Sequence, residues 1–265
     1  MAGVRDRSTV ADVEVSVDVA ARPGTVWRCL TEPALLAKWL AARVDLEARV
    51  GAPLVVHFER HGRRVEGSIV EIVPRRRIVF TWGVAQGAEA ATIPPGSSRV
   101  TIALDPAPLG TRVTLFHAGL PSEEERANHE GGWRDYARSL AGVAQGVPAS
   151  GTPESLVDTW FAACAEPDAE RRSALLAACF DPDGAFRDAR ADLRGRESVS
   201  SWIAQCQSLL PGVRMERDGE VLQARGSLLA RWRTVGPDGS PVATGFSRLR
   251  LGPLGLARSI EGFGA

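Results

Sequence analysis

Residues 121–144 read PSEEERANHEGGWRDYARSLAGVA, and this stretch contains the clearest helix signal in the chain. Ser122 follows Pro121 and is itself followed three residues later by Glu125, which is a capping-box pattern. Apolar residues then recur at helical spacing along one stripe: Trp133, Tyr136, Ala137, Leu140 and Ala144. Because such a stripe must be buried against another apolar surface, we expect a long helix over 122–144 that lies across a sheet.

The preceding sequence predicts that sheet. In residues 12–19, valines alternate with polar residues, the period of a strand with one exposed face. Pro23 and Pro33 each begin a short helical pattern. Further stretches rich in Val, Ile, Phe and Thr predict an antiparallel meander over 52–60, 63–73, 76–83, 98–105 and 111–117. The first half therefore reads as a strand, two short helices, a sheet and a long closing helix.

The second half has the opposite order, with helices first and the sheet last. Thr152-Pro153 and Asp168 are start signals for two helices, and a third helical pattern spans 199–210 before Pro211-Gly212. The residues 181–184, Asp-Pro-Asp-Gly, predict a turn after the second helix. Strand patterns follow at about 213–223, 225–235 and 242–252, and a last one ends at Phe263.

A compositional boundary separates the two halves. The stretch LAGVAQGVPASGTPE, residues 140–154, is rich in small residues, Gly, Pro and Ser, and stands between two helical patterns. No internal repeat at a fixed period is visible. We therefore expect two different domains, 1–145 and 153–265, joined by a linker at 146–152.

Charge and hydropathy limit the partners. The 265 residues include 32 basic and 32 acidic side chains, for a formal net charge of zero, so we expect no nucleic-acid partner. No run of 18 consecutive apolar residues occurs, and the amino terminus carries charges where a signal peptide needs an apolar stretch. These observations predict a cytoplasmic protein with no membrane association.

The metal-ligating residue types are scattered. The cysteines, Cys29, Cys164, Cys179 and Cys206, form no C-x-x-C pair, which disfavours a zinc knuckle, a redox dithiol and a disulfide framework. The histidines, His57, His61, His117 and His129, lack spacings such as H-E-x-x-H. Dinucleotide, P-loop and nucleophile-elbow motifs are also missing from the sequence. We expect no metal and no other cofactor.

The first half resembles a known family. The runs ARPGTVWRCLTEPALLAKWL, EGSIVEIVPRRRIVFTW, RVTIALDPAPLGTRVTLFHAGL and NHEGGWRDYARSL carry the resemblance, which covers about residues 12–144. They are similar to the AHSA1-like group, homologues of the activator of Hsp90 ATPase, within the Bet v 1/START-like (SRPBCC) superfamily. This resemblance implies a helix-grip fold, in a superfamily that includes ligand carriers, cyclases and co-chaperones.

Residues 153–264 resemble the SnoaL-like branch of the NTF2-like superfamily. The matching runs include TWFAACAEPDAERRSALLAACF and FRDARADLRGRESVSSWI. This resemblance implies a cone-shaped α+β domain whose bent sheet surrounds a pocket. The predicted fold class is therefore α+β, with an N-terminal helix-grip domain followed by a C-terminal NTF2-like domain.

Asp188 is the candidate catalytic residue. Ketosteroid isomerases share the NTF2-like fold, and the resemblance places their general-base carboxylate at Asp188. A carboxylate at the rim of an apolar cavity can take a proton from carbon or oxygen. The positions of those enzymes' oxyanion donors fall near Trp160 and Ser247, which lack the same chemistry, so isomerase activity does not transfer. Alternatively, Asp188 is a turn carboxylate that pairs with a neighbouring arginine or caps the backbone before Gly195.

Aromatic residues predict the lining of the two cavities. His117 shares the strand parity of Val113 and Leu115 and is expected to point into the first cavity. The candidate ligand-binding residues are Trp39, Trp82, His117, Trp133 and Tyr136 in the first domain, and Trp160, Trp202, Trp232 and Ser247 in the second. The alternative for each aromatic residue is plain core packing.

Three functions stay open at this point. The leading hypothesis is that one or both cavities bind a small hydrophobic or aromatic molecule. A cyclase, dehydratase or isomerase of polyketide type that uses Asp188 is the first alternative, and whether the chain is an enzyme is left undecided. The second alternative, an Hsp90-activator-like chaperone association, is disfavoured because the chain lacks the extra amino-terminal region of the eukaryotic co-chaperones. The NTF2-like resemblance also implies a homodimer through that domain's open sheet.

Overall fold

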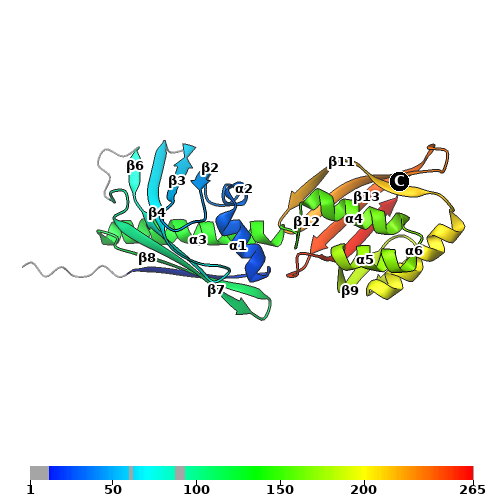
Figure 1. Cartoon of the computed structure of the whole chain (residues 1–265), viewed down its shortest axis with the longest axis horizontal. Helices are drawn as coiled ribbons and strands as arrows, with labels where there is room; N and C mark the ends of the chain where they lie inside the picture. Colours follow the sequence, from blue (N-terminus) through cyan, green and yellow to red (C-terminus); the bar gives the residue numbers. More distant parts are fainter. Residues whose placement is uncertain (1–11, 60–61, 87–92, 265) are drawn as a thin grey trace, which may run out of the picture. The chain divides into compact units, whose positions relative to one another are not determined.

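The computed structural model describes residues 12–59, 62–86 and 93–264 (Figure 1). The chain divides into two compact units. Unit 1 holds the described residues of Met1–Val19 and Val26–Val143, and unit 2 holds Ala20–Thr25 and the described residues of Ala144–Ala265. Each unit combines helices with a large, mainly antiparallel sheet, so the predicted α+β class is confirmed.

The first half of the chain builds one sheet and the helix that crosses it. Its elements are β1 (Val13–Val19), α1 (Pro23–Thr31), α2 (Pro33–Leu36), β2 (Arg43–Leu46), β3 (Pro53–Phe58), β4 (Arg63–Val73), β5 (Arg77–Trp82), β6 (Val84–Gln86), β7 (Ser98–Ala107), β8 (Gly110–Ala118) and α3 (Glu123–Gln145). The strand order is β1-β8-β7-β5-β4-β3-β2, and β6 pairs with β4. The strands predicted from periodicity are all present, together with the short β2 and β6, which the sequence analysis did not predict.

The long helix α3 lies across this sheet, as the helix-grip expectation requires (Figure 1). Its start follows the cap signal, because the backbone N–H of Glu125 donates to Ser122 Oγ at 3.2 Å. Its apolar stripe is buried, and the side chains of Trp133 and Leu140 are each only 2% exposed. The stripe therefore brings α3 residues into contact with the residues of β3, β5 and β8 that are considered below.

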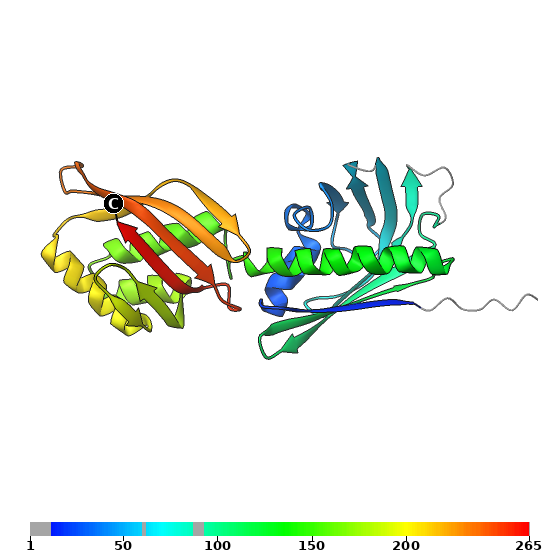
Figure 2. The same cartoon turned by 180° about the vertical axis from the view of Figure 1, so that it is seen from behind.

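The second half builds three helices and a second sheet. Its elements are α4 (Pro153–Ala165), α5 (Ala169–Cys179), β9 (Phe180–Arg187), β10 (Asp192–Arg194), α6 (Arg196–Leu209), β11 (Arg214–Ala224), β12 (Ser227–Val235), β13 (Pro241–Leu251) and β14 (Ala257–Gly264). The strand order is β10-β9-β14-β13-β12-β11, in which only β9 and β14 run parallel. Helices cover one face of this sheet, and Figure 2 shows the opposite face toward the viewer.

Both predicted helix caps of unit 2 form. Thr152 caps α4 through its hydroxyl, and Asp168 caps α5 through Oδ1, which accepts from the backbone N–H of Arg171 at 2.8 Å. The turn predicted at 181–184 is wrong, because these residues lie inside β9. There they form an irregularity, since Phe180 pairs with Ala257 while Ala185 already pairs with Ser259. The turn-forming residues are accommodated as a bulge rather than ending the strand.

The stretch after α3 packs with unit 2. The Gln223 side-chain amide donates to the carbonyl of Gly146 at 2.5 Å, and the backbone N–H of Ala149 donates to the carbonyl of Gly255 at 2.9 Å. Val147, between these contacts, is buried. A segment composed of small residues is therefore held by two hairpins of the second sheet, which the Gly/Pro/Ser content did not predict.

Candidate functional site

A cluster of aromatic rings occupies unit 1 where α3 crosses the sheet. We call Phe58, Trp82, Trp133 and Tyr136 the ring cluster. The ring centroids of Trp82 and Trp133 are 5.2 Å apart, those of Trp133 and Tyr136 are 5.9 Å apart, and those of Phe58 and Tyr136 are 6.2 Å apart. The two tryptophans are buried, whereas Phe58 and Tyr136 are partly exposed. The cluster therefore combines two buried rings with two partly exposed ones.

A chain of hydrogen bonds connects the two buried tryptophans. The indole Nε1–H of Trp133 donates to His117 Nδ1 at 3.0 Å. An indole nitrogen is only a donor, so Nδ1 carries the lone pair and Nε2 carries the proton. His117 Nε2 therefore donates to Ser98 Oγ at 2.8 Å, and Ser98 Oγ donates to the carbonyl of Trp82 at 2.9 Å. The side chain of His117 is fully buried and both of its nitrogens are satisfied.

The electrostatics of His117 match this neutral arrangement. Burial lowers the pKa of His117 from 6.5 to about 3, and the neighbouring charge of His129 adds to the effect. Burial also raises the pKa of Tyr136, with a smaller contribution from Asp135. His117 and Tyr136 are therefore both uncharged at physiological pH.

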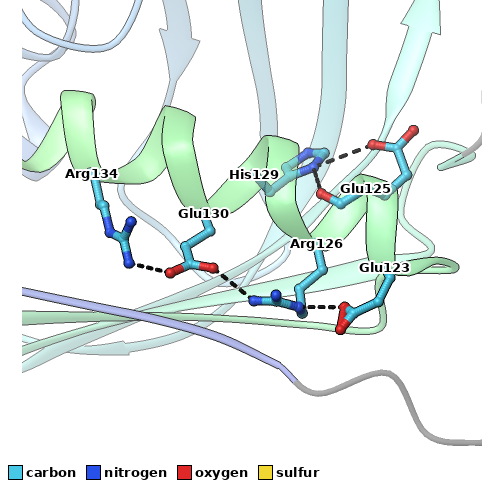
Figure 3. Close-up of polar contacts among 6 residues, drawn as sticks. All are labelled: Glu123, Glu125, Arg126, His129, Glu130 and Arg134. Atoms are coloured by element: carbon cyan, nitrogen blue, oxygen red, sulfur yellow. Dashed lines mark hydrogen bonds and ion pairs between the residues drawn. The ribbon is translucent and has the colours of Figure 1, made fainter.

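His129 extends the cluster toward the start of α3. Its ring centroid is 4.9 Å from that of His117, in an edge-to-face arrangement. Its Nδ1 donates to the carbonyl of Glu125 at 2.8 Å, and Glu125 Oε2 is 3.4 Å from the same nitrogen. Figure 3 shows these two side chains on a different side of α3 from an ion-pair ladder along the helix, formed by Glu123, Arg126, Glu130 and Arg134.

Trp39, the remaining candidate of the first domain, lies apart from the ring cluster. Its Nε1–H donates to the carbonyl of Cys29 at 2.8 Å, which ties the segment after α2 to α1. Trp39 is 6% exposed and belongs to no ring pair among the described residues. Its geometry is that of a packing residue.

Asp188 follows β9 and caps a turn. The backbone N–H groups of Arg190 and Ala191 each donate to its Oδ1 at 2.7 Å. This is the backbone-capping geometry that the sequence analysis offered as the alternative to catalysis, although it precedes Gly195 by several residues. Oδ2 makes no hydrogen bond among the described residues. Oδ1 therefore holds the side chain in place, and Oδ2 is available to another partner.

The sheet places Asp188 beside small residues. Ser247 pairs with Ala230 on one side and with Gly262 on the other, so these three positions share the helix-covered face. A Cβ atom at Gly262 would lie 3.4 Å from the Cβ of Asp188. Across from them on α6, burial raises the pKa of the Cys206 thiol, and the charge of Asp188 adds to the shift. Asp188 therefore lies close to Gly262, the register partner of Ser247, and to Cys206 on α6.

The tryptophans of unit 2 differ in their surroundings. Trp160 is buried on α4, with its ring centroid 5.6 Å from that of Phe186 and 6.0 Å from that of Phe180. Trp232 is buried against the backbone of Gly245. Trp202 on α6 is partly exposed and forms no ring pair within the described part of the chain. Trp160 thus belongs to a second aromatic group, while Trp202 stands alone.

The other titratable residues do not converge. Burial raises the pKa of Cys29 and of Cys179 to about 12, so these thiols stay protonated. His57 lies outside the ring cluster, with Nε2 3.0 Å from Asp45 Oδ2, and His61 lies outside the described residues. No group of three His, Cys, Asp or Glu side chains in the described ranges could hold a metal ion. Nor do those ranges contain a helix that could span a bilayer.

Part of the chain matches a known protein family. Residues 20–145 match the family model AHSA1, described as activator of Hsp90 ATPase homolog 1-like protein. This match covers α1, α2, the strands β2 to β8 and α3, and it begins just after β1. No curated protein matches the chain.

Solved structures resemble the chain in part. A SnoaL-like family protein from Agrobacterium tumefaciens is 25% identical and covers 42% of this chain and 95% of its own, with a TM-score of 0.41. The Aha1 dimer from Colwellia psychrerythraea is 17% identical over 51% of this chain and 96% of its own, at 0.43. DynU16, a protein of the dynemicin biosynthetic locus, is 19% identical over 90% of this chain and 80% of its own, at 0.44. With TM-scores below 0.5, these likenesses carry no functional argument.

The sequence analysis named most residues of the ring cluster but did not single out Phe58. Trp82, Trp133, Tyr136 and His117 lie together in the structure, whereas Phe58 was only part of a strand pattern. Ser98 and His129 were also missed as neighbours of His117. The available signal for His129 was its position four residues before Trp133, on the same face of α3.

Proposed function

We propose that the protein binds a small hydrophobic or aromatic ligand at the ring cluster of unit 1. The observation that supports this proposal is the pairing of the partly exposed rings of Phe58 and Tyr136 with the buried rings of Trp82 and Trp133. An aromatic ligand would stack on the exposed ring surface and be excluded from water there. The helix-covered face of unit 2 near Asp188 is a second proposed binding region.

A thermal-shift screen tests ligand binding. An aromatic compound present at 100 times its dissociation constant should stabilise the folded chain by about 2.7 kcal/mol. Phe58→Ala removes one accessible ring and is expected to weaken binding by about tenfold. Phe116→Ala is the matched control, because Phe116 is an exposed phenylalanine on β8 outside the cluster. Equal affinities for the two variants would contradict the proposed site.

A second function, proton transfer by Asp188, is favoured by an Oδ2 that makes no hydrogen bond among the described residues and by the closeness of Asp188 to Gly262, the register partner of Ser247. In this proposal Oδ2 takes a proton from an acidic C–H next to a carbonyl, as a cyclase, dehydratase or isomerase of polyketide type requires. The side chain becomes a neutral carboxylic acid, and the substrate becomes an enolate. Ser247 is placed on the same face to donate a hydrogen bond.

Deuterium exchange into 2-tetralone, followed by NMR, measures such proton abstraction directly. Asp188→Asn keeps an acceptor for the two turn N–H groups and should slow catalysed exchange by about 10²-fold or more. Asp192→Asn is the matched control, because Asp192 is exposed and pairs with Arg187. Exchange at the same rate in wild type and Asp188→Asn would exclude Asp188 as the base.

We also propose that the protein forms a homodimer through the open sheet face of unit 2. The register places Phe246 beside Phe263 on this face, and Leu229 on β12 lies diagonally next to Phe246. Their side chains are 45%, 53% and 37% exposed, an unusual apolar content for a solvated sheet. Sedimentation equilibrium should show a dimer for the wild type and a monomer for Phe246→Glu. A wild-type monomer at all accessible concentrations would contradict this proposal.

A further inference from the structure

We infer that His129 recognises a hydroxyl group on the aromatic ligand of unit 1, with Nε2 as the hydrogen-bond acceptor. This inference rests on the ligand binding proposed for the ring cluster and adds the chemical class of the ligand. That class is an aromatic alcohol, such as a phenol or a naphthol, in preference to a plain hydrocarbon or an aryl ether.

The tautomer of His129 follows from one contact. Nδ1 lies 2.8 Å from the carbonyl oxygen of Glu125, and a carbonyl oxygen only accepts hydrogen bonds. Nδ1 therefore carries the proton, and Nε2 of the neutral ring carries a lone pair. Among the described residues, nothing hydrogen-bonds to this Nε2 atom. It is an acceptor aimed away from the helix backbone and left for another molecule.

The adjacent His117 differs from His129 in its hydrogen bonding and burial. His117 uses both nitrogens, one for Trp133 and one for Ser98, and is completely buried. His129 touches it ring to ring but keeps 18% of its side chain exposed. Of the two neighbouring imidazoles, His129 alone combines solvent access with an unused nitrogen.

The position of His129 on α3 connects it with the ring cluster. Glu125, His129 and Trp133 follow one another at intervals of four residues and so share a face of the helix. That face meets the sheet, whereas the ion-pair ladder is placed on another side (Figure 3). A polar pair on the sheet-facing stripe costs desolvation energy that an apolar pair would not, and a ligand hydroxyl would offset this cost at Nε2.

Tyr136 is the rival for this role. Tyr136 is half-buried with its ring beside that of Phe58, and its hydroxyl makes no hydrogen bond among the described residues. A phenolic hydroxyl can donate as well as accept, so Tyr136 would bind an ether oxygen and a hydroxyl almost equally. An imidazole acceptor binds only the hydroxyl. The two assignments therefore predict different selectivity between an alcohol and its methyl ether.

Calorimetric titration of the full chain with 2-naphthol and 2-methoxynaphthalene separates these cases. The wild type should bind 2-naphthol about five- to tenfold more tightly, the difference made by one hydrogen bond. His129→Phe keeps an aromatic ring against His117 and should bind both probes with the affinity of the ether. His57→Gln, a histidine change outside the cluster, should keep the wild-type preference. Tyr136→Phe should keep it as well.

Each result has one meaning. Equal binding of the two probes by the wild type, or a preference that survives His129→Phe, overturns the role of His129 while the proposed ligand binding stands. Equal binding of the two probes by the wild type, weakened for both probes in Tyr136→Phe, assigns the contact to Tyr136 instead. Binding of neither probe overturns the proposed binding at the ring cluster and this inference with it.

A measurement on the wild type covers the case in which His129→Phe does not fold. In ¹⁵N NMR of the histidine rings, addition of 2-naphthol should shift the Nε2 resonance of His129 and leave its Nδ1 resonance nearly unchanged. A spectrum in which only His117 responds, or neither ring responds to bound 2-naphthol, would contradict the assignment.

Discussion

Arg172→Met is expected to lower the free energy of unfolding by about 2–4 kcal/mol. Arg172 is only 4% exposed, and its guanidinium group makes no ion pair among the described residues. Instead Nη1 donates to the carbonyls of Glu166 at 2.8 Å and Pro167 at 3.2 Å, just past the end of α4. Nε donates to Ser200 Oγ at 3.0 Å. The buried charge thus compensates the carbonyls at the negative end of a helix.

Methionine keeps the apolar stem of the side chain and removes only the guanidinium group, so the loss reports on these hydrogen bonds. The carbonyls of Glu166 and Pro167 would then each lose a donor in a protected environment. Arg171→Met is the matched control, because Arg171 is the exposed neighbour on the same helix. Urea unfolding of the full chain measures both variants. A difference between them of less than about 0.5 kcal/mol would show that Arg172 is not a structural cation.

The second large effect is a loss of stability in acid caused by His117. Its pKa is lowered from 6.5 to about 3, first by burial and then by the neighbouring His129. Between these values the unfolded chain binds a proton that the folded chain excludes, so stability is complete above about pH 6.5 and falls as the pH decreases toward 3. The slope is about 1.4 kcal/mol per pH unit, which accumulates to several kcal/mol. Protonation of Nδ1 would also break its bond with Trp133.

His117→Gln tests this origin, because an amide offers a donor and an acceptor in place of the two ring nitrogens but does not titrate. The stability difference between wild type and variant should shrink steadily as the pH falls from about 6.5, by about 1.4 kcal/mol per unit. Carboxylates contribute equally to both proteins and cancel. Parallel curves for His117→Gln would refute the assignment.

Local signals in the sequence predicted most elements of both units. Ser122, Thr152 and Asp168 start their helices as expected, because an N-cap side chain satisfies backbone N–H groups within three residues of itself. Alternation of apolar residues predicted β1 and the strands of the meander. The turn predicted at 181–184 failed because pairing with β14 continues on either side of it.

The candidate sites were predicted only in part. Parity on β8 and spacing on α3 correctly indicated that His117 and Trp133 face the same interior, but not that one donates a hydrogen bond to the other. The same limit holds for Asp188. Its residue type suggested either a base or a turn cap, and the contacts show that Oδ1 is the cap. The backbone N–H groups of Arg190 and Ala191 engage Oδ1, and Oδ2 makes no hydrogen bond among the described residues.

Helix starts, strand faces and the division of the chain into two α+β units were readable from the amino-acid order, since they depend on periodicity and on contacts between near neighbours. The ring cluster, the tautomer of the neutral His117 ring and the buried contacts of Arg172 depend on residues brought together from distant parts of the chain. Register, burial and side-chain direction set these contacts, and they arise only when the sheets and helices pack. One-dimensional patterns identify which faces are apolar, whereas folding selects the partner of each polar atom on those faces.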